Sequence, residues 1–441
     1  MITKISGRKS QLMKRFGWFI AIAAFTALHV SGQDISGDWQ GSLKAGPQEL
    51  RVILQVRGDK RSWTANLLSI DQSPDRGVGM AATSFSSDGS NVKFAIGQVQ
   101  GSYEGKLSAD GSTITGTWTQ LRSLPLEFRR ATKDTAWADP SPHHAVFIPV
   151  EKDVSLEVLD WGGTGRPLVL LAGLGNTAHV FDKFAPRLTS RFHVIGITRR
   201  GFGASSAPPP TTETYAADRL GDDVLEVIDA LKLERPVLVG HSLAGEELSS
   251  VGSRHPERVT GMIYLEAGYS YAYYDRARGD LGIDLTELQT KLHQLEPGNS
   301  PKNQQQLIED LLGTTLPAFE RDLKQAQKSA ADDLSRPTAT AQVAPITLAI
   351  MRGMQKYTDI RVPVLAIYAM PHATGQPFKD DSARAAADAQ DEALVGAQAR
   401  AFESGVPSAR VVRLPHANHF VFLSNEDDVL REMNAFLNNR P

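Results

Sequence analysis

The chain has 441 residues, of which 41% are hydrophobic and 22% are charged, so it is long enough for two or three globular domains. Its formal net charge of -3 argues against nucleic acid or anionic membranes as partners, because both attract strongly basic surfaces. The sequence contains no cysteine, which excludes disulfides, thiolate metal sites and cysteine nucleophiles.

Residues 1–32 have the features of a secretory signal peptide. Basic residues at positions 4, 8, 9, 14 and 15 precede an apolar run over residues 16–28, and small residues follow at 31 and 32. The run is shorter than the roughly 20 residues that span a bilayer, although an uncleaved membrane anchor is the alternative. We therefore expect an exported protein, periplasmic or secreted, without stable membrane insertion after cleavage near Gly32.

Residues 33–133 predict a small antiparallel β domain, either a sandwich or a barrel. Apolar and polar residues alternate over short runs, for example over residues 50–56. Asp-Gly pairs at 88–89 and 110–111 each separate two such runs, and this pair favours the tight turns of β-hairpins. The region resembles small β modules that precede catalytic domains in some exported bacterial hydrolases, and it indicates no site of its own. We expect a structural or orienting role.

Residues 134–145 have the composition of a linker, with Pro140, Pro142 and the pair His143 and His144. The two histidines are candidate metal ligands, but solvated linker histidines are far commoner. We therefore predict no metal site and no cofactor.

From residue 146 to 441, strand-like and helix-like runs alternate. Four apolar runs are typical of buried strands, at residues 168–171, 192–197, 237–239 and 261–265. The segment between the second and third of them has a helical period. This alternation predicts an α/β fold with a doubly wound, mostly parallel sheet, in which ligands bind at the carboxyl ends of the strands.

The pentapeptide GHSLA at residues 240–244 follows one of these strands. A serine on a strained strand-to-helix turn needs small residues two positions away on each side, and Gly240 and Ala244 meet that demand. The pattern predicts Ser242 as the nucleophile of a hydrolase, although the fifth position is Ala instead of the usual Gly. We expect His241, beside the nucleophile, to have an orienting role at most.

These features resemble the α/β-hydrolase superfamily over residues 146–441. The resemblance implies an oxyanion hole made by the backbone N–H groups of Leu243 and Leu174, unless the glycine loop around Leu174 is an ordinary turn. It also implies that His419, in the loop before the last helix, is the general base, with His416 as the rival candidate. Because the nucleophile is a serine, related enzymes with an aspartate nucleophile, such as haloalkane dehalogenases and epoxide hydrolases, are disfavoured.

Several charged residues near this motif are expected to have structural roles. Glu246 and Glu247 follow the nucleophile on its helix, where a buried ion pair with Arg199 or Arg200 is favoured over chemistry. Thr198 begins a stretch that resembles the family's Asp-x-Arg-Gly-x-Gly pattern, with Thr at the usual Asp.

The triad acid is where the chain departs from the commonest pattern of the family. Most members carry the acid just after the seventh strand, but the strand predicted at 363–368 is followed by no carboxylate before Asp380 and Asp381. The sixth strand ends instead in Glu266, a position that some members use. We favour Glu266 as the acid that orients the histidine, with Asp380 or Asp381 as the alternative.

Residues 270–360 predict a mostly helical cap inserted after the sixth strand, and tyrosines at its start either line an acyl pocket or form a core edge. The combination implies a carboxylesterase that cleaves a small-molecule ester through an acyl-enzyme. Amide, carbon–carbon or peracid chemistry on the same triad is one alternative, and a catalytically degenerate binding module is another. The natural substrate, the acyl chain length and the oligomeric state are left open.

Overall fold

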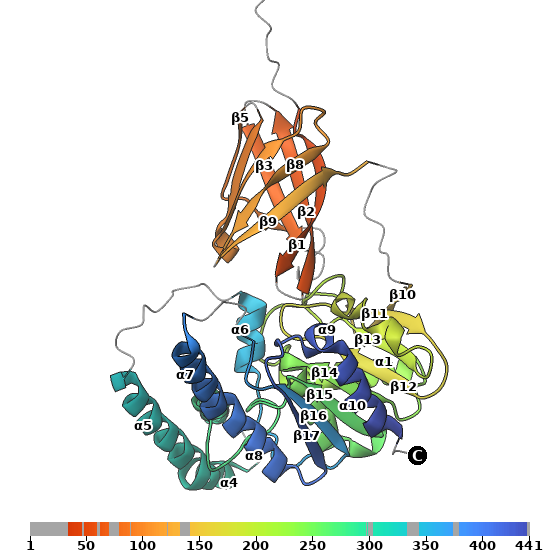
Figure 1. Cartoon of the computed structure of the whole chain (residues 1–441). Helices are drawn as coiled ribbons and strands as arrows, with labels where there is room; N and C mark the ends of the chain where they lie inside the picture. Colours follow the sequence, from red (N-terminus) through yellow and green to blue (C-terminus); the bar gives the residue numbers. More distant parts are fainter. Residues whose placement is uncertain are drawn as a thin grey trace, which may run out of the picture.

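The computed structural model describes residues 34–45, 48–59, 62–69, 79–88, 90–120, 122–132, 142–296, 298, 303–332, 344–373 and 379–438. The predicted signal peptide and most of the predicted linker lie outside the described residues. The described chain folds into an all-β domain followed by an α/β domain (Figure 1).

The β domain is one nine-stranded antiparallel sheet in the order β4-β3-β2-β1-β9-β8-β7-β6-β5, curved around its own core as a half-barrel. Its strands are β1 (Gly37–Ala45), β2 (Gln48–Asp59), β3 (Ser62–Ser69), β4 (Met80–Ala81), β5 (Ser84–Asp88), β6 (Asn91–Ile96), β7 (Gly101–Leu107), β8 (Thr113–Thr119) and β9 (Ser123–Arg130). Alternate side chains point inward and bury Trp39, Tyr103 and Phe128. The predicted hairpin at 110–111 is confirmed, because β7 and β8 pair with Leu107 opposite Ile114.

The α/β domain is built on an eight-stranded sheet in the order β10-β11-β13-β12-β14-β15-β16-β17. The strands are β10 (His144–Glu151), β11 (Val154–Gly162), β12 (Pro167–Leu171), β13 (His193–Ile197), β14 (Val237–His241), β15 (Gly261–Leu265), β16 (Val364–Ala369) and β17 (Ala409–Leu414). β11 is antiparallel to both of its neighbours, β10 and β13, and every other pair of neighbouring strands is parallel, which confirms the predicted fold class. β10 begins inside the predicted linker, because His144 already pairs with Asp160.

Helices cover both faces of this sheet, and the central strands are therefore buried on both sides. One face packs against α1 (Ala217–Ala230), α2 (Gly245–Arg254) and α8 (Ala397–Gly405). The other packs against the short 3-10 helices η2 (Ala178–Phe181) and η3 (Ala185–Arg187) and against α9 (Val421–Ser424) and α10 (Glu426–Asn438).

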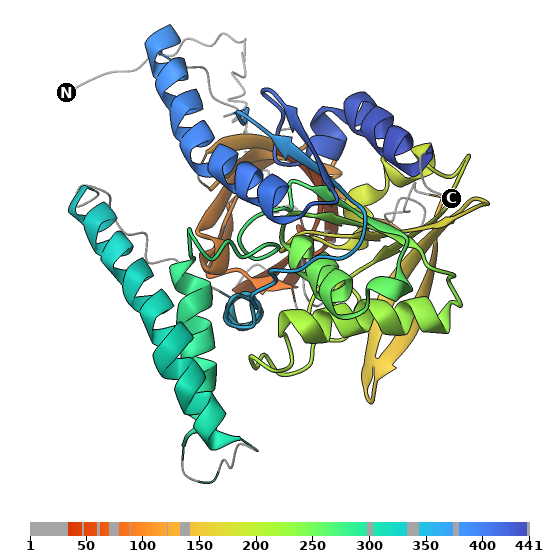
Figure 2. The ribbon, with the colours of Figure 1, turned by 90° about the horizontal axis from the view of Figure 1, so that it is seen from below.

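The expected helical cap lies between β15 and β16. It contains α3 (Leu281–Gln294), α4 (Gln304–Asp310), α5 (Leu316–Asp332) and α6 (Pro345–Arg352). Asp280 caps α3 by accepting from the N–H groups of Gly282 and Ile283. Figure 2 shows α3 and α5 side by side in an arm that extends away from the sheet. Among the described helices, none combines the length and the apolar character that a membrane crossing requires.

Two ion pairs join the domains. Glu49 on β2 accepts from Lys183 at 2.8 Å, and Arg51 on the same strand lies 3.7 Å from Asp182. Both partners in the α/β domain belong to the segment between η2 and η3. The β domain therefore contacts the α/β domain just after the loop that contains Leu174.

Candidate active site

Ser242 lies on the turn between β14 and α2 with a φ of 52°, in the left-handed region that non-glycine residues rarely adopt. Such strain costs about 1–3 kcal/mol and collects at functional sites. The backbone of a second loop approaches the serine closely, since a Cβ on Gly173 would stand 2.9 Å from the Ser242 Cβ. Glycine at position 173 is what allows this approach.

Arg199 connects the loop after β12 to α2, the helix that follows Ser242. The guanidinium donates to the carbonyl of Ala172 at 3.0 Å and pairs with Glu247 on α2 at 2.5 Å, so one predicted ion pair is confirmed. Leu174 and Leu243 pack within one apolar cluster at this junction. The two residues expected to form the oxyanion hole are therefore brought together.

Of the neighbouring charged residues that the structure describes, Arg200 is paired and Glu246 is not. Arg200 pairs with Asp223 on α1 at 2.6 Å. The Glu246 carboxyl is fully buried and makes no hydrogen bond within the described residues, so it does not form the expected ion pair. Burial raises the pKa of Glu246 well above its ordinary value despite the nearby charge of Arg199.

Glu266 follows β15, has a φ of 52° and is 0% exposed. Its Oε1 accepts from the N–H of Ala369 at 2.6 Å, and its Oε2 accepts from the Tyr269 hydroxyl at 2.7 Å. Two imidazoles reach the same Oε2, His372 through Nε2 at 2.7 Å and His419 through Nδ1 at 3.1 Å. We call Glu266, His372 and His419 the Glu266 cluster.

Within this cluster, Glu266 and His372 each favour the charged form of the other. Burial alone raises the pKa of Glu266, but hydrogen bonds from His372 and His419 and the charge of His372 lower it to about 2. Burial lowers the pKa of His372, whereas Glu266 and Asp391 raise it to about 9. At neutral pH the acid is therefore a carboxylate, and His372 is a cation held between two carboxylates.

His241 contacts both the backbone carbonyl and the ring of His419. The Nε2–H of His241 donates to the carbonyl of His419 at 3.0 Å, and the two ring centroids are 4.8 Å apart. Burial and the neighbouring His419 lower the pKa of His241 to about 3, so His241 is neutral. His416 is exposed on the same loop and donates its backbone N–H to Pro371, so the structure brings His419, and not His416, to Glu266.

The alternative acids lie in α7 (Asp381–Asp391), which follows β16. Asp380 caps this helix by accepting from the N–H of Ala383 at 2.8 Å, and both Asp380 and Asp381 are exposed. Of the three carboxylates proposed from sequence, Glu266 is the one in contact with His419.

Comparison with known proteins agrees with this arrangement of sheet, turn and loop. The family described as the alpha/beta hydrolase fold matches residues 166–426, which is more than half of the chain. The chain belongs to the alpha/beta hydrolase fold family.

Individual relatives match at low identity. Fluoroacetate dehalogenase from a Burkholderia species is 30% identical over 116 residues, 26% of this chain and 38% of that enzyme, so the match spans less than half of the relative. The 2-(acetamidomethylene)succinate hydrolase of Mesorhizobium japonicum is 24% identical over 283 residues, 62% of this chain and 89% of that protein. A crystal structure of E-2-(acetamidomethylene)succinate hydrolase is 21% identical over 67% of this chain and 99% of its own, with a TM-score of 0.39.

Sequence reasoning missed His372, and it left the tyrosines after β15 as either pocket or core residues. His372 lies after β16, where most of the family carries the acid, so a titratable residue at that place was the available signal. The Tyr269 hydroxyl donates to Glu266, and Tyr271 lies beside Ser242, so two of the tyrosines after β15 belong to the site. Burial raises the pKa of Tyr271 well above its ordinary value, and it stays protonated.

Proposed function

We propose that this alpha/beta hydrolase is a carboxylesterase. Ser242 attacks the carbonyl of a small-molecule ester while His419 takes the serine proton and passes it to the leaving alcohol. Glu266 holds the imidazole in the required tautomer and stabilises its protonated form. The N–H groups of Leu174 and Leu243 bind the oxyanion, and water then releases the acid with His419 again acting as base. No cofactor enters any of these steps.

The observation that carries the proposal is the contact between Glu266 and His419. A fully buried carboxylate with a pKa of about 2 stands 3.1 Å from Nδ1 of the histidine, which leaves Nε2 for the nucleophile. Ser242, Glu266 and His419 follow the carboxyl ends of β14, β15 and β17, which lie on one edge of the parallel part of the sheet with β16 between the last two.

A second candidate is amide cleavage by the same groups. It is favoured by the Mesorhizobium japonicum relative, which covers 62% of this chain and whose named substrate carries an acetamido group. The two reactions share the acyl-enzyme and differ in the leaving group that His419 must protonate.

Matched substrates separate the candidates. The purified protein is assayed with p-nitrophenyl esters from acetate to laurate and with the corresponding p-nitroanilides. We expect turnover of at least one ester, with the anilides much slower. Faster anilide cleavage would select the amide reaction. No turnover of either series, together with no labelling by a fluorophosphonate probe, would indicate a degenerate binding module.

The Ser242→Ala variant is the control for this assay. Loss of such a nucleophile typically lowers kcat by about 10⁴–10⁶, and covalent labelling by a fluorophosphonate probe should disappear as well. Circular dichroism checks that the fold is retained. Near-normal turnover or labelling by the variant would contradict the assignment of Ser242.

We also propose that the protein acts outside the cytoplasm, periplasmic or secreted, because residues 1–32 have the parts of a signal peptide. Fractionation of an expressing bacterium and N-terminal sequencing of the exported form test this. An N-terminus near Gln33 is expected, and cytoplasmic protein that retains residues 1–32 would contradict it.

A further inference from the structure

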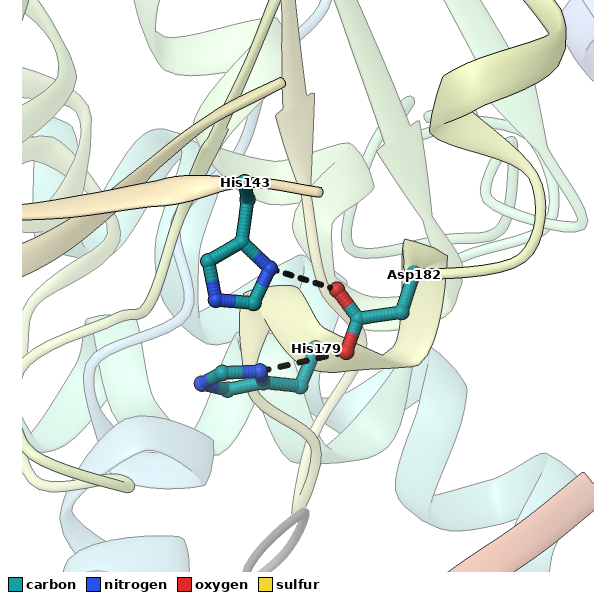
Figure 3. A group of neighbouring side chains, drawn as sticks. All are labelled: His143, His179 and Asp182. Atoms are coloured by element: carbon teal, nitrogen blue, oxygen red, sulfur yellow. Dashed lines mark hydrogen bonds and ion pairs between the residues drawn. The ribbon is translucent and has the colours of Figure 1, made fainter. Parts of the chain in front are cut away.

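A second group of two histidines and a carboxylate lies where the chain enters the α/β domain (Figure 3). His143 precedes β10, His179 belongs to η2 and Asp182 follows η2. Nδ1 of His143 is 3.0 Å from Oδ1 of Asp182, and Nδ1 of His179 is 3.2 Å from Oδ2. The carboxylate thus offers one oxygen to each ring. We call these three residues the Asp182 cluster.

The three side chains are held in place by burial. They are 7%, 4% and 15% exposed for His143, His179 and Asp182, so His143 is not the solvated linker residue that its sequence context predicts. The His143 ring packs edge-on against Trp161 and His179, with centroids 5.8 and 5.0 Å apart. Ligands that are already ordered lose little conformational freedom when they bind an ion.

The spacing suits a small divalent cation. One ligand atom from each of the three residues lies within 4.8 Å of the others. Zinc binds histidine nitrogen and carboxylate oxygen at roughly 2.0–2.2 Å, which puts neighbouring ligands of a tetrahedral ion about 3.3 Å apart. The nitrogen–oxygen separations of 3.0 and 3.2 Å are close to this value, but they involve different oxygens of Asp182, so an ion held by one of these oxygens requires the carboxylate to rotate.

A second carboxylate, that of Glu157, lies on the side of the His179 ring that faces away from Asp182. Oε1 of Glu157 lies 3.5 Å from Nε2 of His179, and Oε2 accepts from the Thr198 hydroxyl at 2.9 Å. Metal-binding histidines usually donate their second ring N–H to such a carboxylate. With that proton on Nε2, a neutral His179 presents a lone pair on Nδ1 to an oxygen of Asp182. In this tautomer the two facing lone pairs call for a cation between them, either a proton or a metal ion, whereas the tautomer with its proton on Nδ1 donates to Asp182 and needs no cation.

We propose that His143, His179 and Asp182 bind one divalent transition-metal ion of the zinc class. The ligands are Nδ1 of both rings and the Asp182 carboxylate, and Glu157 orients His179. Water completes the coordination, as in other sites with three protein ligands. His179 and Asp182 closely follow the loop that contains Leu174, and His143 precedes the first strand of the α/β domain. The ion would therefore link the start of this domain to that loop. Its role is structural, and it takes no part in the ester chemistry.

The competing arrangement contains protons only. Arg51 of the β domain lies 3.7 Å from Asp182 Oδ2, and a protonated His179 beside it would also balance the two carboxylates. The two arrangements differ in their response to added metal. A zinc ion displaces the extra proton in the first and finds no site in the second.

The test uses the full chain carrying a tag without histidines, stripped with EDTA and dialysed. Calorimetric titration with zinc chloride should show one ion per chain, and the midpoint of thermal unfolding should rise, because a ligand of the folded state stabilises it. His143→Gln and His179→Gln should each weaken binding by more than about 100-fold, beyond the roughly 10–100-fold expected for Glu157→Gln. His144→Gln is the matched control, since His144 is exposed on β10 and should bind zinc normally.

Two further measurements identify which residues bind the zinc. Zinc that binds at the Glu266 cluster instead would be lost in His372→Gln and retained in His143→Gln, which would overturn the proposal. X-ray absorption of the zinc-loaded wild-type chain should show two imidazole ligands, and it does not depend on the folding of any variant. No binding by the wild-type chain, or a zinc site without imidazole ligands, would favour the proton-only network.

Discussion

The molecule contains two groups of two histidines around one carboxylate, and they differ in where the chain brings them together. The Glu266 cluster assembles at the carboxyl ends of adjacent parallel strands, β15 and β16, and on the loop after β17. The Asp182 cluster assembles at the antiparallel edge of the sheet, from the segment before β10 and the short helix η2.

Their surroundings differ as well. Glu266 is 0% exposed and accepts from one backbone N–H and one tyrosine hydroxyl in addition to its two imidazoles. It lies on the same edge of the sheet as Ser242, whose backbone is strained. Asp182 is 15% exposed on its side chain and faces an arginine from another domain. These differences are the reason for proposing proton transfer at the Glu266 cluster and ion binding at the Asp182 cluster.

The largest effect is expected from Glu266→Gln, which keeps the shape of the acid and removes its charge. Loss of the charge leaves the imidazolium of His419 unsupported, and comparable changes in a catalytic triad lower kcat by about 10⁴. Asp380→Asn is the matched control and should change kcat little, because Asp380 caps α7. Both are measured on one ester at saturating concentration, with circular dichroism as the check of folding. The reverse ranking would move the acid to the loop after β16.

The sequence predicted the parts of the site that local rules determine. Ser242 and Glu266 both stand at the ends of apolar runs, and in a parallel sheet such ends lie on one edge. His372 was not predicted, because its contact with Glu266 spans 106 residues and depends on how the loop after β16 folds back. Hydrophobic periodicity places strands but carries no information about such loops.

The same limit explains the error at His143. A histidine beside prolines in a polar segment is usually solvated, and the sequence offers no sign that Trp161 and Asp182 cover it. The boundary of the α/β domain also moved by two residues, since His144 and Ala145 already pair with Asp160 and Leu159 of β11. The ion pair of Glu247 with Arg199 was predicted from sequence. The lack of a hydrogen bond to the Glu246 carboxyl among the described residues was not, because it depends on side-chain packing.

A smaller effect is expected from removing the charge of His372. Its pKa in the folded protein is raised from 6.5 to about 9, so its contribution to stability is complete below pH 6.5 and is lost as the pH rises through 9. His372→Gln should therefore lower the free energy of unfolding by on the order of 2 kcal/mol at pH 6 and much less at pH 10.

Urea unfolding of both proteins at a series of pH values between 6 and 10 measures this difference. His416→Gln is the control, because it removes an exposed imidazole from the neighbouring loop without touching Glu266. A difference between wild type and His372→Gln that does not change with pH would mean that His372 is neutral in the folded protein.

The smallest effect is expected from deleting the β domain, residues 34–133. The deletion removes Arg51 from the Asp182 cluster and leaves every described contact of the Glu266 cluster in place. The ion pair between Glu49 and Lys183 is also lost, but Lys183 is 75% exposed, and such surface pairs contribute about 0–1 kcal/mol. We expect kcat on a short-chain p-nitrophenyl ester to change by less than about tenfold, which is about 1.4 kcal/mol of barrier. A truncated chain that is folded by circular dichroism and yet inactive would show that contact with the β domain sets the geometry of the Leu174 loop. The two clusters would then be coupled and not independent.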